Sequence, residues 1–438
     1  MDSVLETIRV KDKSYLFFRH SLMMFACGPE VEDAVERLKR GAAEEDGNAA
    51  LLRGYAQRDA EAKRRIEAAQ ADYMDRDLNI AGCDINVFYG CNLNCKYCFA
   101  EGGSHGKRGA MTRERAREVV DYVLDHAGDN DQLKVTIIGG EPLMNLKVFE
   151  EVASYGTREA GKRNKTVRFA TTTNGTLLTE RALELLHQYD VAYIISLDSH
   201  DRATNDFLRG DRSGGSAYDA IMKRWDALDE REIIRINVTV TPYNMNLSEI
   251  ARHLFARGVN YIHFTEVKSD RKDMCFTPEQ IEELKREYDQ LADLLLDKLI
   301  SGERVGCYPL LKDLNKLHTR RPVLQVCSTL NRRVAFSPDG KIYPCDMLMW
   351  DDYCLGDTEQ GADPASINGL KQRLADEGEC DGCWARYLCG GECLADKLWD
   401  NREQRALRCE LKRHIFSLKL YIYDALVHQA EGFEFSKY

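Results

Sequence analysis

The 438-residue chain lacks a long hydrophobic run, an excess of positive charge, an internal repeat and a low-complexity tract. Short apolar runs such as 135–138 and 193–197 fall far below the roughly 18 residues of a membrane span, and no basic-then-apolar leader opens the chain. The formal net charge of −11 (61 basic and 72 acidic residues) argues against general nucleic-acid binding, which needs a basic surface. We therefore expect a cytoplasmic protein without a nucleic-acid or membrane partner.

Cysteine, by contrast, is abundant, with 15 residues in the chain. Because cytosolic thiols stay reduced, metal or redox chemistry is a better explanation than disulfides. Their spacing is uneven, with one group at 91–98 and a second in the last quarter of the chain. Such clustering indicates ligands.

From residue 84 onward, short β-rich runs alternate with helical patterns, which predicts parallel strands joined by crossover helices. The expected strands span 84–88, 133–138, 166–173, 191–197, 233–241 and 261–267. The first expected helix begins at Thr112, which is a candidate cap. The other expected helices span 146–155, 179–188, 217–228, 247–257 and 277–300. The predicted fold class is therefore α/β, a partial (β/α)6 barrel that stays open if no further strand joins. In such folds, functional residues follow the carboxyl ends of the strands.

Residues 1–78 predict a small α+β module that precedes the barrel. It would contain a hairpin (6–10 and 15–19) and two helices (29–40 and 48–75). The module either binds a peptide or packs against the barrel, and packing is slightly favoured. We expect the barrel over 79–300, a cysteine-rich domain over 301–412 and a terminal segment over 413–438, with a helix over 413–430.

Three cysteines, Cys91, Cys95 and Cys98, follow the first strand directly. Three ligands cannot complete a structural zinc site or a four-cysteine cluster, so a metal position stays open for substrate or cofactor. The C-x3-C-x2-C spacing, with aromatic Tyr97 before the third cysteine, resembles the signature of radical S-adenosylmethionine (SAM) enzymes. By that resemblance the three cysteines are catalytic and hold a [4Fe–4S] cluster whose fourth iron binds SAM.

A glycine-rich segment after the second strand resembles the GGEP motif of the same family. The resemblance implies that Gly139 and Gly140 let the backbone approach the methionine part of SAM, and that Glu141 pairs with its ammonium group. Taken alone, this segment would be an ordinary tight turn.

Polar residues after the later strands extend the resemblance. Ser196, Asp198 and Arg209 resemble the segment that holds the ribose and carboxylate of SAM, since Arg makes two charge-assisted bonds to a carboxylate. Asn174 is a weaker candidate for a polar contact, and Tyr97 would lie near the adenine. Alone, these residues would be a helix start and a surface cation, but they share one end of the predicted barrel.

The second cysteine group has the spacing C-x12-G-x4-C followed by C-x2-C-x5-C-x3-C and one later cysteine. A zinc ribbon is the ordinary alternative, but its two pairs are normally separated by about 15–20 residues, whereas only five separate Cys383 from Cys389. Seven thiolates are also too many for one zinc. The pattern resembles the SPASM extension of radical SAM enzymes, which carries two auxiliary [4Fe–4S] clusters. By that resemblance the outer cluster would use Cys380, Cys383, Cys389 and Cys409, and the inner cluster Cys327, Cys345 and Cys393.

The resemblance identifies three ligands of the inner cluster and leaves the fourth unassigned. Cys307, in a predicted turn beside Gly306, is the preferred completion, and Cys354 is the second candidate; an ordinary buried thiol is an equal alternative. Gly340, between Cys327 and Cys345, is expected at a hairpin turn that needs a positive φ.

The resemblance implies a radical SAM/SPASM maturase of a ribosomally synthesised precursor peptide. An external low-potential reductant, such as flavodoxin or ferredoxin, would reduce the first cluster, and SAM would yield a 5′-deoxyadenosyl radical that removes a hydrogen atom from the peptide. Residues 139–145 (GGEPLMN) look most like the thioether-forming maturases that act on cysteine-rich peptides, and this resemblance favours a thioether crosslink over a carbon–carbon crosslink. Alternatives are a sulfatase-maturing, formylglycine-forming enzyme and, from another class, a non-catalytic iron–sulfur electron carrier or zinc-bound adaptor. The sequence leaves the peptide, the bond and the oligomeric state open.

Overall fold

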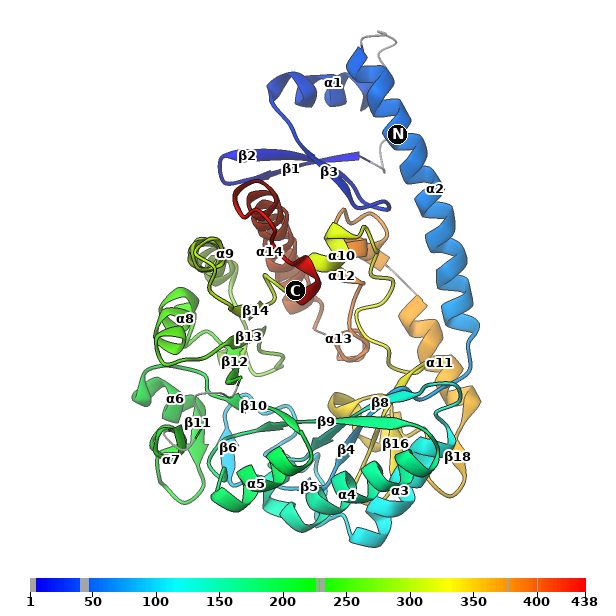
Figure 1. The fold of residues 1–438 in the computed structure, drawn as a ribbon, viewed down its shortest axis with the longest axis vertical. Coiled ribbons are helices and arrows are strands. Elements are labelled where there is room, and N and C mark those ends of the chain that lie inside the picture. Colours follow the sequence, from blue (N-terminus) through cyan, green and yellow to red (C-terminus); the bar gives the residue numbers. More distant parts are fainter. Residues whose placement is uncertain (1–4, 40–46, 226–227, 229–232, 376–377, 400) are drawn as a thin grey trace.

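A computed structural model describes residues 5–39, 47–225, 228, 233–375, 378–399 and 401–438 (Figure 1). Its central element, within these ranges, is an 11-stranded sheet. The strands are β4 (Gly82–Asn86), β8 (Gln132–Ile138), β9 (Thr166–Thr173), β10 (Ala192–Ser196), β12 (Arg235–Val240), β13 (Tyr261–Glu266), β14 (Gly306–Tyr308), β15 (Arg333–Phe336), β16 (Lys341–Tyr343), β17 (Gly356–Asp357) and β18 (Gly361–Ala362).

The strand order is β14-β13-β12-β10-β9-β8-β4-β15-β16-β17-β18. The six predicted strands are confirmed as β4, β8, β9, β10, β12 and β13, all paired in parallel. Two further parallel strands join them, β14 beside β13 and β15 beside β4. The sheet is larger than predicted because these two strands come from the cysteine-rich segment and are too short for a periodic pattern.

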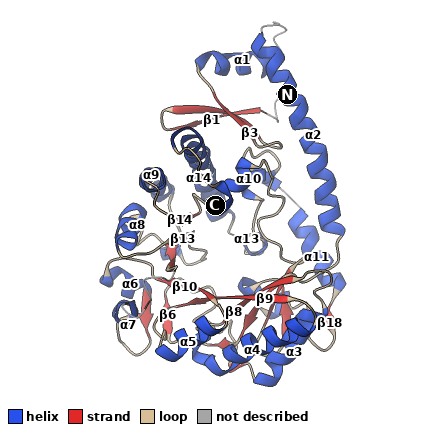
Figure 2. Ribbon diagram, in the orientation of Figure 1, coloured by secondary structure: helices blue, strands red, loops and turns tan. Residues whose placement is uncertain are grey.

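Amphipathic crossover helices cover the outer side of the sheet (Figure 2). They are α3 (Arg113–Asp125), α4 (Leu146–Lys162), α5 (Glu180–Gln188), α7 (Ala217–Trp225), α8 (Leu247–Ala256) and α9 (Pro278–Ile300), with the shorter α6 (Arg202–Leu208) before α7. Thr112 caps α3 as predicted, because its side chain accepts a hydrogen bond from the Arg115 N–H. The predicted end of the 217–228 helix includes residues 226 and 227, which lie outside the described residues.

The N-terminal module contains a three-stranded antiparallel sheet and two helices. The predicted hairpin is confirmed as β1 (Leu5–Val10) and β2 (Lys13–Phe18), and β3 (Met23–Ala26) adds a strand that was not predicted. Helices α1 (Pro29–Lys39) and α2 (Gly47–Asp75) follow. Figure 1 shows α2 running along one side of the molecule from this sheet to the C-terminal segment.

The C-terminal segment consists of short helices and loops, followed by one long helix. The short helices are α10 (Leu314–His318), α11 (Pro364–Ala375), α12 (Arg386–Cys389) and α13 (Leu394–Leu398). The long helix α14 spans Arg402–Gln429 and begins earlier than the predicted residue 413, so Cys409 lies on it. Gly340 occupies the β15–β16 turn with φ of 86°, as predicted. No helix in the described ranges has both the length and the apolar character of a bilayer span.

Candidate active site

The first cysteine loop is held to the barrel by a small sheet. After β4 the chain forms β5 (Phe88–Tyr89), which pairs with β7 (Gly109–Ala110), and then β6 (Leu93–Cys95), which pairs antiparallel with β11 (Arg209–Asp211). In that register Arg209 stands directly opposite Cys95. Residues more than a hundred positions apart are therefore neighbours, and the predicted SAM-carboxylate ligand is next to the predicted cluster ligand.

Burial dominates the electrostatics of these thiols. It raises the pKa of Cys91, and it raises the pKa of Cys95 to about 11, although the Arg209 guanidinium acts in the opposite direction. Cys98 and Cys91 also raise the pKa of Cys95, so the three thiols share one local field. A bound cationic metal offsets this cost because it favours the thiolate. Three neighbouring thiols are the ligand type that iron–sulfur clusters use, so the donor set fits a cluster.

Glu141 links three segments of the site. Its side chain is fully buried and accepts hydrogen bonds from the Leu143 N–H (3.1 Å), the Thr173 hydroxyl (2.8 Å) and the Asn174 N–H (2.7 Å). Burial raises its pKa, and these hydrogen bonds act in the opposite direction. An ionised carboxylate has about four acceptor positions, so three donors leave capacity for one more, such as an ammonium group.

Asn174 connects this carboxylate with the cysteine loop. Its side-chain amide donates to the Asn92 side-chain oxygen at 2.8 Å and approaches the Cys91 sulfur at 3.7 Å. Because its backbone N–H donates to Glu141, one residue fixes the cysteine loop relative to the GGEP segment. Asn174 therefore has a clear positioning role beside the polar contact that the sequence predicted for it.

Three glycines allow the loops of the site to cross at very short distances. A Cβ atom on Gly140 would lie 2.1 Å from the Gly90 carbonyl oxygen, and one on Gly103 would lie 2.1 Å from the Gly140 Cα. A Cβ on Gly139 would be 3.1 Å from the Phe88 carbonyl oxygen. The structure thus explains the glycines by backbone packing. Gly90 and Gly103 were missed in the sequence, although the Gly102-Gly103 pair after the cysteine loop is a turn signal.

Tyr97, Asp198 and Arg209 form a buried polar group. The Tyr97 hydroxyl donates to the Asp198 carboxylate, and Arg209 donates to the Tyr97 oxygen at 2.6 Å and to Asp198 at 3.4 Å. Asp198 also accepts a 2.9 Å bond from the Thr239 N–H. Burial raises the pKa of Tyr97 well above its usual value. The Arg209 Nε is buried without a hydrogen-bond partner in the described residues, so the guanidinium keeps a donor for a ligand carboxylate. Ser196 is buried at the end of β10, opposite Asn237 of β12.

A cavity of about 720 Å³ opens beside the cysteine loop. Cys95, Tyr97 and Cys98 form one side, and the C-terminal segment supplies others, including Trp399. Asp396 also lines it and forms ion pairs with Lys268 (3.1 Å) and Arg408 (3.3 Å). Burial would raise the pKa of Asp396, but these cations hold it below its usual value. The cysteine loop and the C-terminal segment therefore line one cavity, whose volume falls in the range of small-molecule sites.

Several of the later cysteines influence one another electrostatically, and their division into an inner and an outer set stays a prediction. Cys327 and Cys393 both raise the pKa of Cys345, whose burial is the largest cause. Cys409 and Cys389 likewise raise the pKa of Cys380, for which burial is again the largest cause. Cys380 and Cys383 are near neighbours on one turn, since the Cys383 N–H donates to the Cys380 carbonyl. In the described ranges, no three His, Cys, Asp or Glu side chains are arranged to hold a single metal ion.

Lys412 is a neighbour of the outer set that the sequence did not reveal. Burial would lower its pKa, but Cys389, Asp396 and Cys409 raise it above its usual value. Lys412 lies one helical turn after Cys409 on α14, so its i, i+3 spacing would have indicated the contact if the helix start had been predicted.

Cys307 and Cys354 lie apart from each other. Cys307 is on β14, is 1% exposed and approaches the Tyr308 carbonyl oxygen at 3.7 Å. Cys354 packs near Tyr343 and approaches the Gly356 carbonyl oxygen at 3.4 Å. β14 is one edge strand of the large sheet, whereas Cys345 follows β16, which lies eight strands away in the strand order. Completion of the inner cluster by either residue stays a prediction.

Comparison with known proteins agrees with this geometry. Residues 85–256, which include the cysteine loop and both SAM-site segments, match the Radical SAM superfamily. The chain contains a radical SAM domain. The matched superfamily supports an enzyme that uses SAM and a [4Fe–4S] cluster.

Relatives match much more of the chain than this domain. The uncharacterized protein MJ0907 of Methanocaldococcus jannaschii is 29% identical over 68% of this chain and 92% of its own length. The antilisterial bacteriocin subtilosin biosynthesis protein AlbA of Bacillus subtilis is 29% identical over 68% of this chain and 66% of its own length. A cysteine-type anaerobic sulfatase-maturating enzyme of Clostridium perfringens is 24% identical over 78% of this chain and 96% of its own length.

Solved structures share the fold. A structure of anSMEcpe with bound AdoMet and the Kp18Cys peptide has a TM-score of 0.66 at 20% identity and covers 79% of this chain and 99% of that chain. The structure of Streptococcus suis SuiB bound to the precursor peptide SuiA has a TM-score of 0.53 at 13% identity. It covers 91% of this chain and 96% of that chain. The shared architecture therefore includes the region beyond the radical SAM domain.

Proposed function

We propose that this radical SAM enzyme is a SPASM-type maturase that oxidatively crosslinks a ribosomally synthesised peptide. The observation that carries the proposal is the Cys91–Asn174–Glu141 connection, which joins the cluster loop to the SAM-site loops beside a cavity that the C-terminal cysteine segment helps to form. A non-catalytic electron carrier has no need for this connection. Support for a peptide substrate comes from AlbA, which acts in bacteriocin biosynthesis, and from the peptide-bound structures of anSMEcpe and SuiB.

In this proposal Cys91, Cys95 and Cys98 hold the catalytic cluster, Arg209 and Ser196 bind polar groups of SAM, and Glu141 receives its ammonium group. When bound, cluster and SAM supply the 5′-deoxyadenosyl radical that removes a hydrogen atom from the peptide. Asp198 holds Tyr97 and Arg209 in place through its hydrogen bonds. The aromatic side chains of Phe99, Trp350 and Trp399 on the cavity wall limit access of water.

The auxiliary ligands follow the two cysteine sets. Cys380, Cys383, Cys389 and Cys409 would hold the outer cluster, with Lys412 offsetting its negative charge. The inner cluster would use Cys327, Cys345 and Cys393. A low-potential reductant of the flavodoxin or ferredoxin type would supply the electron for SAM cleavage.

A thioether is the favoured product, and the support is the GGEPLMN segment at residues 139–145; a carbon–carbon crosslink is next. Formylglycine formation is the second candidate function, because the C. perfringens sulfatase-maturating enzyme matches 96% of its own length. The products differ: a crosslink joins two residues of the peptide, whereas formylglycine is an aldehyde at a single residue.

Anaerobic reconstitution followed by assays of iron and 5′-deoxyadenosine tests the proposal. We expect about twelve irons per chain, as three clusters of four. The Cys91→Ala/Cys95→Ala/Cys98→Ala variant should lose about a third of the iron and all SAM cleavage. A variant that still produced 5′-deoxyadenosine would overturn the assignment of the catalytic cluster.

The product is tested by incubating the enzyme with any short cysteine-rich peptide found encoded beside this gene, followed by tandem mass spectrometry. Loss of a pair of hydrogen atoms, with fragmentation blocked between two residues, is the expected result. An aldehyde at one Cys or Ser would favour the sulfatase-maturing alternative. No change in the peptide during rapid SAM cleavage would contradict the choice of substrate.

A further inference from the structure

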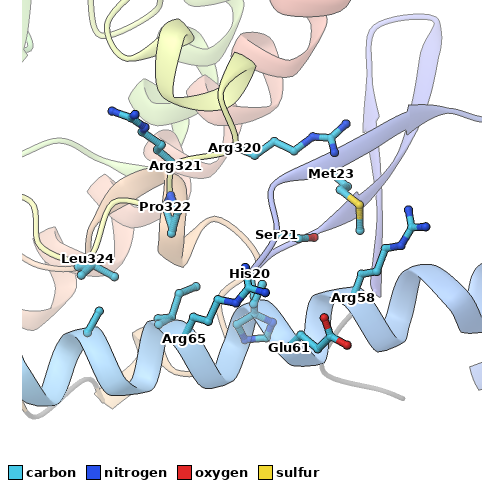
Figure 3. A pocket seen from close by; sticks show the side chains of 13 residues that line it. His20, Ser21, Met23, Arg58, Glu61, Arg65, Arg320, Arg321, Pro322 and Leu324 are labelled. Atoms are coloured by element: carbon cyan, nitrogen blue, oxygen red, sulfur yellow. The ribbon is translucent and has the colours of Figure 1, made fainter.

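A second cavity, of about 650 Å³, lies between the N-terminal module and the C-terminal segment. Its walls come from α2, from the turn between β2 and β3, and from residues 320–324 after α10 (Figure 3). The catalytic cavity is lined by a different set of residues. Neither the radical chemistry nor the cysteine sets account for this space.

One face of α2 forms the first wall. Arg58, Ala62, Arg65 and Ala69 follow one another at intervals of four, three and four residues, so they share a side of the helix. The two alanines leave room beside the helix, and the two exposed arginines stand at the rim of that room. This alternation of small and cationic side chains makes the wall both hollow and positively charged.

The opposite wall also carries two arginines, Arg320 and Arg321. Backbone contacts hold its position, because the Val323 N–H donates to the Tyr387 carbonyl at 2.8 Å and the Arg386 side chain donates to the Leu324 carbonyl at 3.2 Å. Figure 3 shows Arg320 reaching from this segment toward Met23. The two walls therefore present cations to the same space from distant parts of the chain.

A buried carboxylate fixes the end of the cavity. Asp59 of α2 is 0% exposed and accepts hydrogen bonds from the His20 N–H (3.1 Å), the His20 ring (2.6 Å), the Ser21 N–H (2.7 Å) and the Ser21 hydroxyl (2.7 Å). These bonds tie the β2–β3 turn to α2. The cavity is thus preorganised, which lowers the entropy cost of binding a ligand.

The four guanidinium groups of this cavity have no carboxylate within ion-pair distance in the described part of the chain. Among the described residues, Arg65, Arg320 and Arg321 form no side-chain ion pair, and Arg58 contacts the Tyr55 ring at 5.7 Å. Glu61 is the one acidic residue among those that line the cavity. Four positive charges against one negative charge are unusual in a chain whose net charge is −11. An anionic ligand would relieve their mutual repulsion and use their planar donor groups.

We propose that this cavity binds an acidic segment of the substrate peptide, outside the residues that are modified. The inference rests on the proposed peptide substrate. Paired carboxylates along an extended chain match arginines that approach from two walls, and each guanidinium can hold a carboxylate through two hydrogen bonds. Such a site would retain the peptide on the enzyme while its reactive residues occupy the catalytic cavity.

Fluorescence anisotropy with a labelled poly-glutamate peptide on the reconstituted full-length enzyme tests the site without turnover. We expect binding that weakens with added salt, and no binding of a poly-glutamine peptide of equal length. Arg58→Glu/Arg65→Glu and, on the other wall, Arg320→Glu/Arg321→Glu should each weaken binding by about tenfold. The matched control is Arg64→Glu, because Arg64 is an exposed arginine of the same helix outside the cavity lining.

Wild-type affinity in both double variants, or an equal loss in Arg64→Glu, would overturn the proposal. Displacement of poly-glutamate by inorganic phosphate at a similar concentration would also count against it, as a site for small anions only. Iron content and circular dichroism show whether each variant folds, and the second wall provides a variant if the first does not. An enzyme that binds poly-glutamate but modifies no peptide would instead contradict the proposed function, so the two failures are distinguishable.

Discussion

Glu141, Asn174 and Asp198 each contact protein groups from more than one loop of the active site. The sequence pattern predicts their proximity to SAM, and the structure adds that they also hold the loops together. At the scale of the residue, ligand binding and stability therefore depend on the same side chains. Substitutions here are expected to alter both.

Glu141→Ala is the first test at this scale. It leaves three buried donors without an acceptor, and each unpaired donor costs about 1–3 kcal/mol. We expect a lower free energy of unfolding as well as weaker SAM binding, measured by urea titration and by equilibrium dialysis. Glu184→Ala, at an exposed position of α5, is the control. Unchanged stability and SAM affinity together would reduce Glu141 to an ordinary turn residue.

His263 of β13 gives a prediction about pH. Burial lowers its pKa to about 4, and Lys312 acts in the same direction. The unfolded chain, with a pKa of about 6.5, therefore takes up the proton first as pH falls. The stability from the neutral ring is complete above about pH 6.5 and is lost as pH falls toward about 4. His263→Gln should make the free energy of unfolding less dependent on pH in this window, whereas His187→Gln at an exposed position should not. Identical slopes for His263→Gln and wild type would refute this.

At the scale of the element, the loops after β4 and β8 cross within van der Waals contact. This crossing is possible because Gly103 and Gly140 lack side chains, and the Gly90 carbonyl lies against Gly140. The small β6–β11 sheet then places Arg209 opposite Cys95. Loop packing and strand pairing together thus bring the cluster ligands and the SAM ligands to one place.

Gly140→Ala tests the crossing. The new Cβ would lie 2.1 Å from the Gly90 carbonyl oxygen, so the backbone must move and the cysteine loop with it. We expect a lower melting temperature and loss of iron from the catalytic cluster. Electron paramagnetic resonance measures the loss of the cluster. Gly161→Ala in α4 meets open space and should stabilise the protein by about 0.5–1 kcal/mol. Full iron and unchanged melting in Gly140→Ala would show that the loops do not need this close approach.

At the scale of the whole molecule, the N-terminal module packs directly on the outer cysteine loop. Phe17 contacts the Trp384 ring edge-on at 5.7 Å, and Arg19 donates to the Asp381 carbonyl at 2.8 Å. Tyr15 is fully buried and donates to Asp424 of α14 at 3.1 Å. These contacts support the packing role of residues 1–78, and the arginine-lined cavity lies at the same junction.

Deletion of residues 1–78 should therefore give aggregated, iron-poor protein, because the surface around the outer cluster would be exposed. Phe17→Ala is a milder test: loss of a buried aromatic ring costs about 3–5 kcal/mol, and we expect selective loss of iron from the outer cluster. Mössbauer spectroscopy and iron analysis measure this. A soluble deletion variant with full iron would contradict the packing role and leave peptide binding as the function of the module.

The amino-acid sequence by itself determined the positions of the ligand motifs and most of the barrel. Hydrophobic periodicity reports which face of a segment is buried, so the six long barrel strands, the crossover helices and the first hairpin could be predicted. The spacing of Cys91, Cys95 and Cys98 indicated the chemistry because three ligands on one loop require an additional ligand from elsewhere.

The tertiary structure alone decided how distant segments meet. The short strands β14 and β15 carry no periodic signal, and pairing with longer strands stabilises them. The start of α14 at Arg402 was missed because the cysteine spacing conceals the helical pattern. The Gly90–Gly140 crossing and the cavity between α2 and residues 320–324 depend on contacts between segments that are far apart in the chain. Such contacts leave no local pattern, because each partner is selected by the fold and not by its neighbours in the chain.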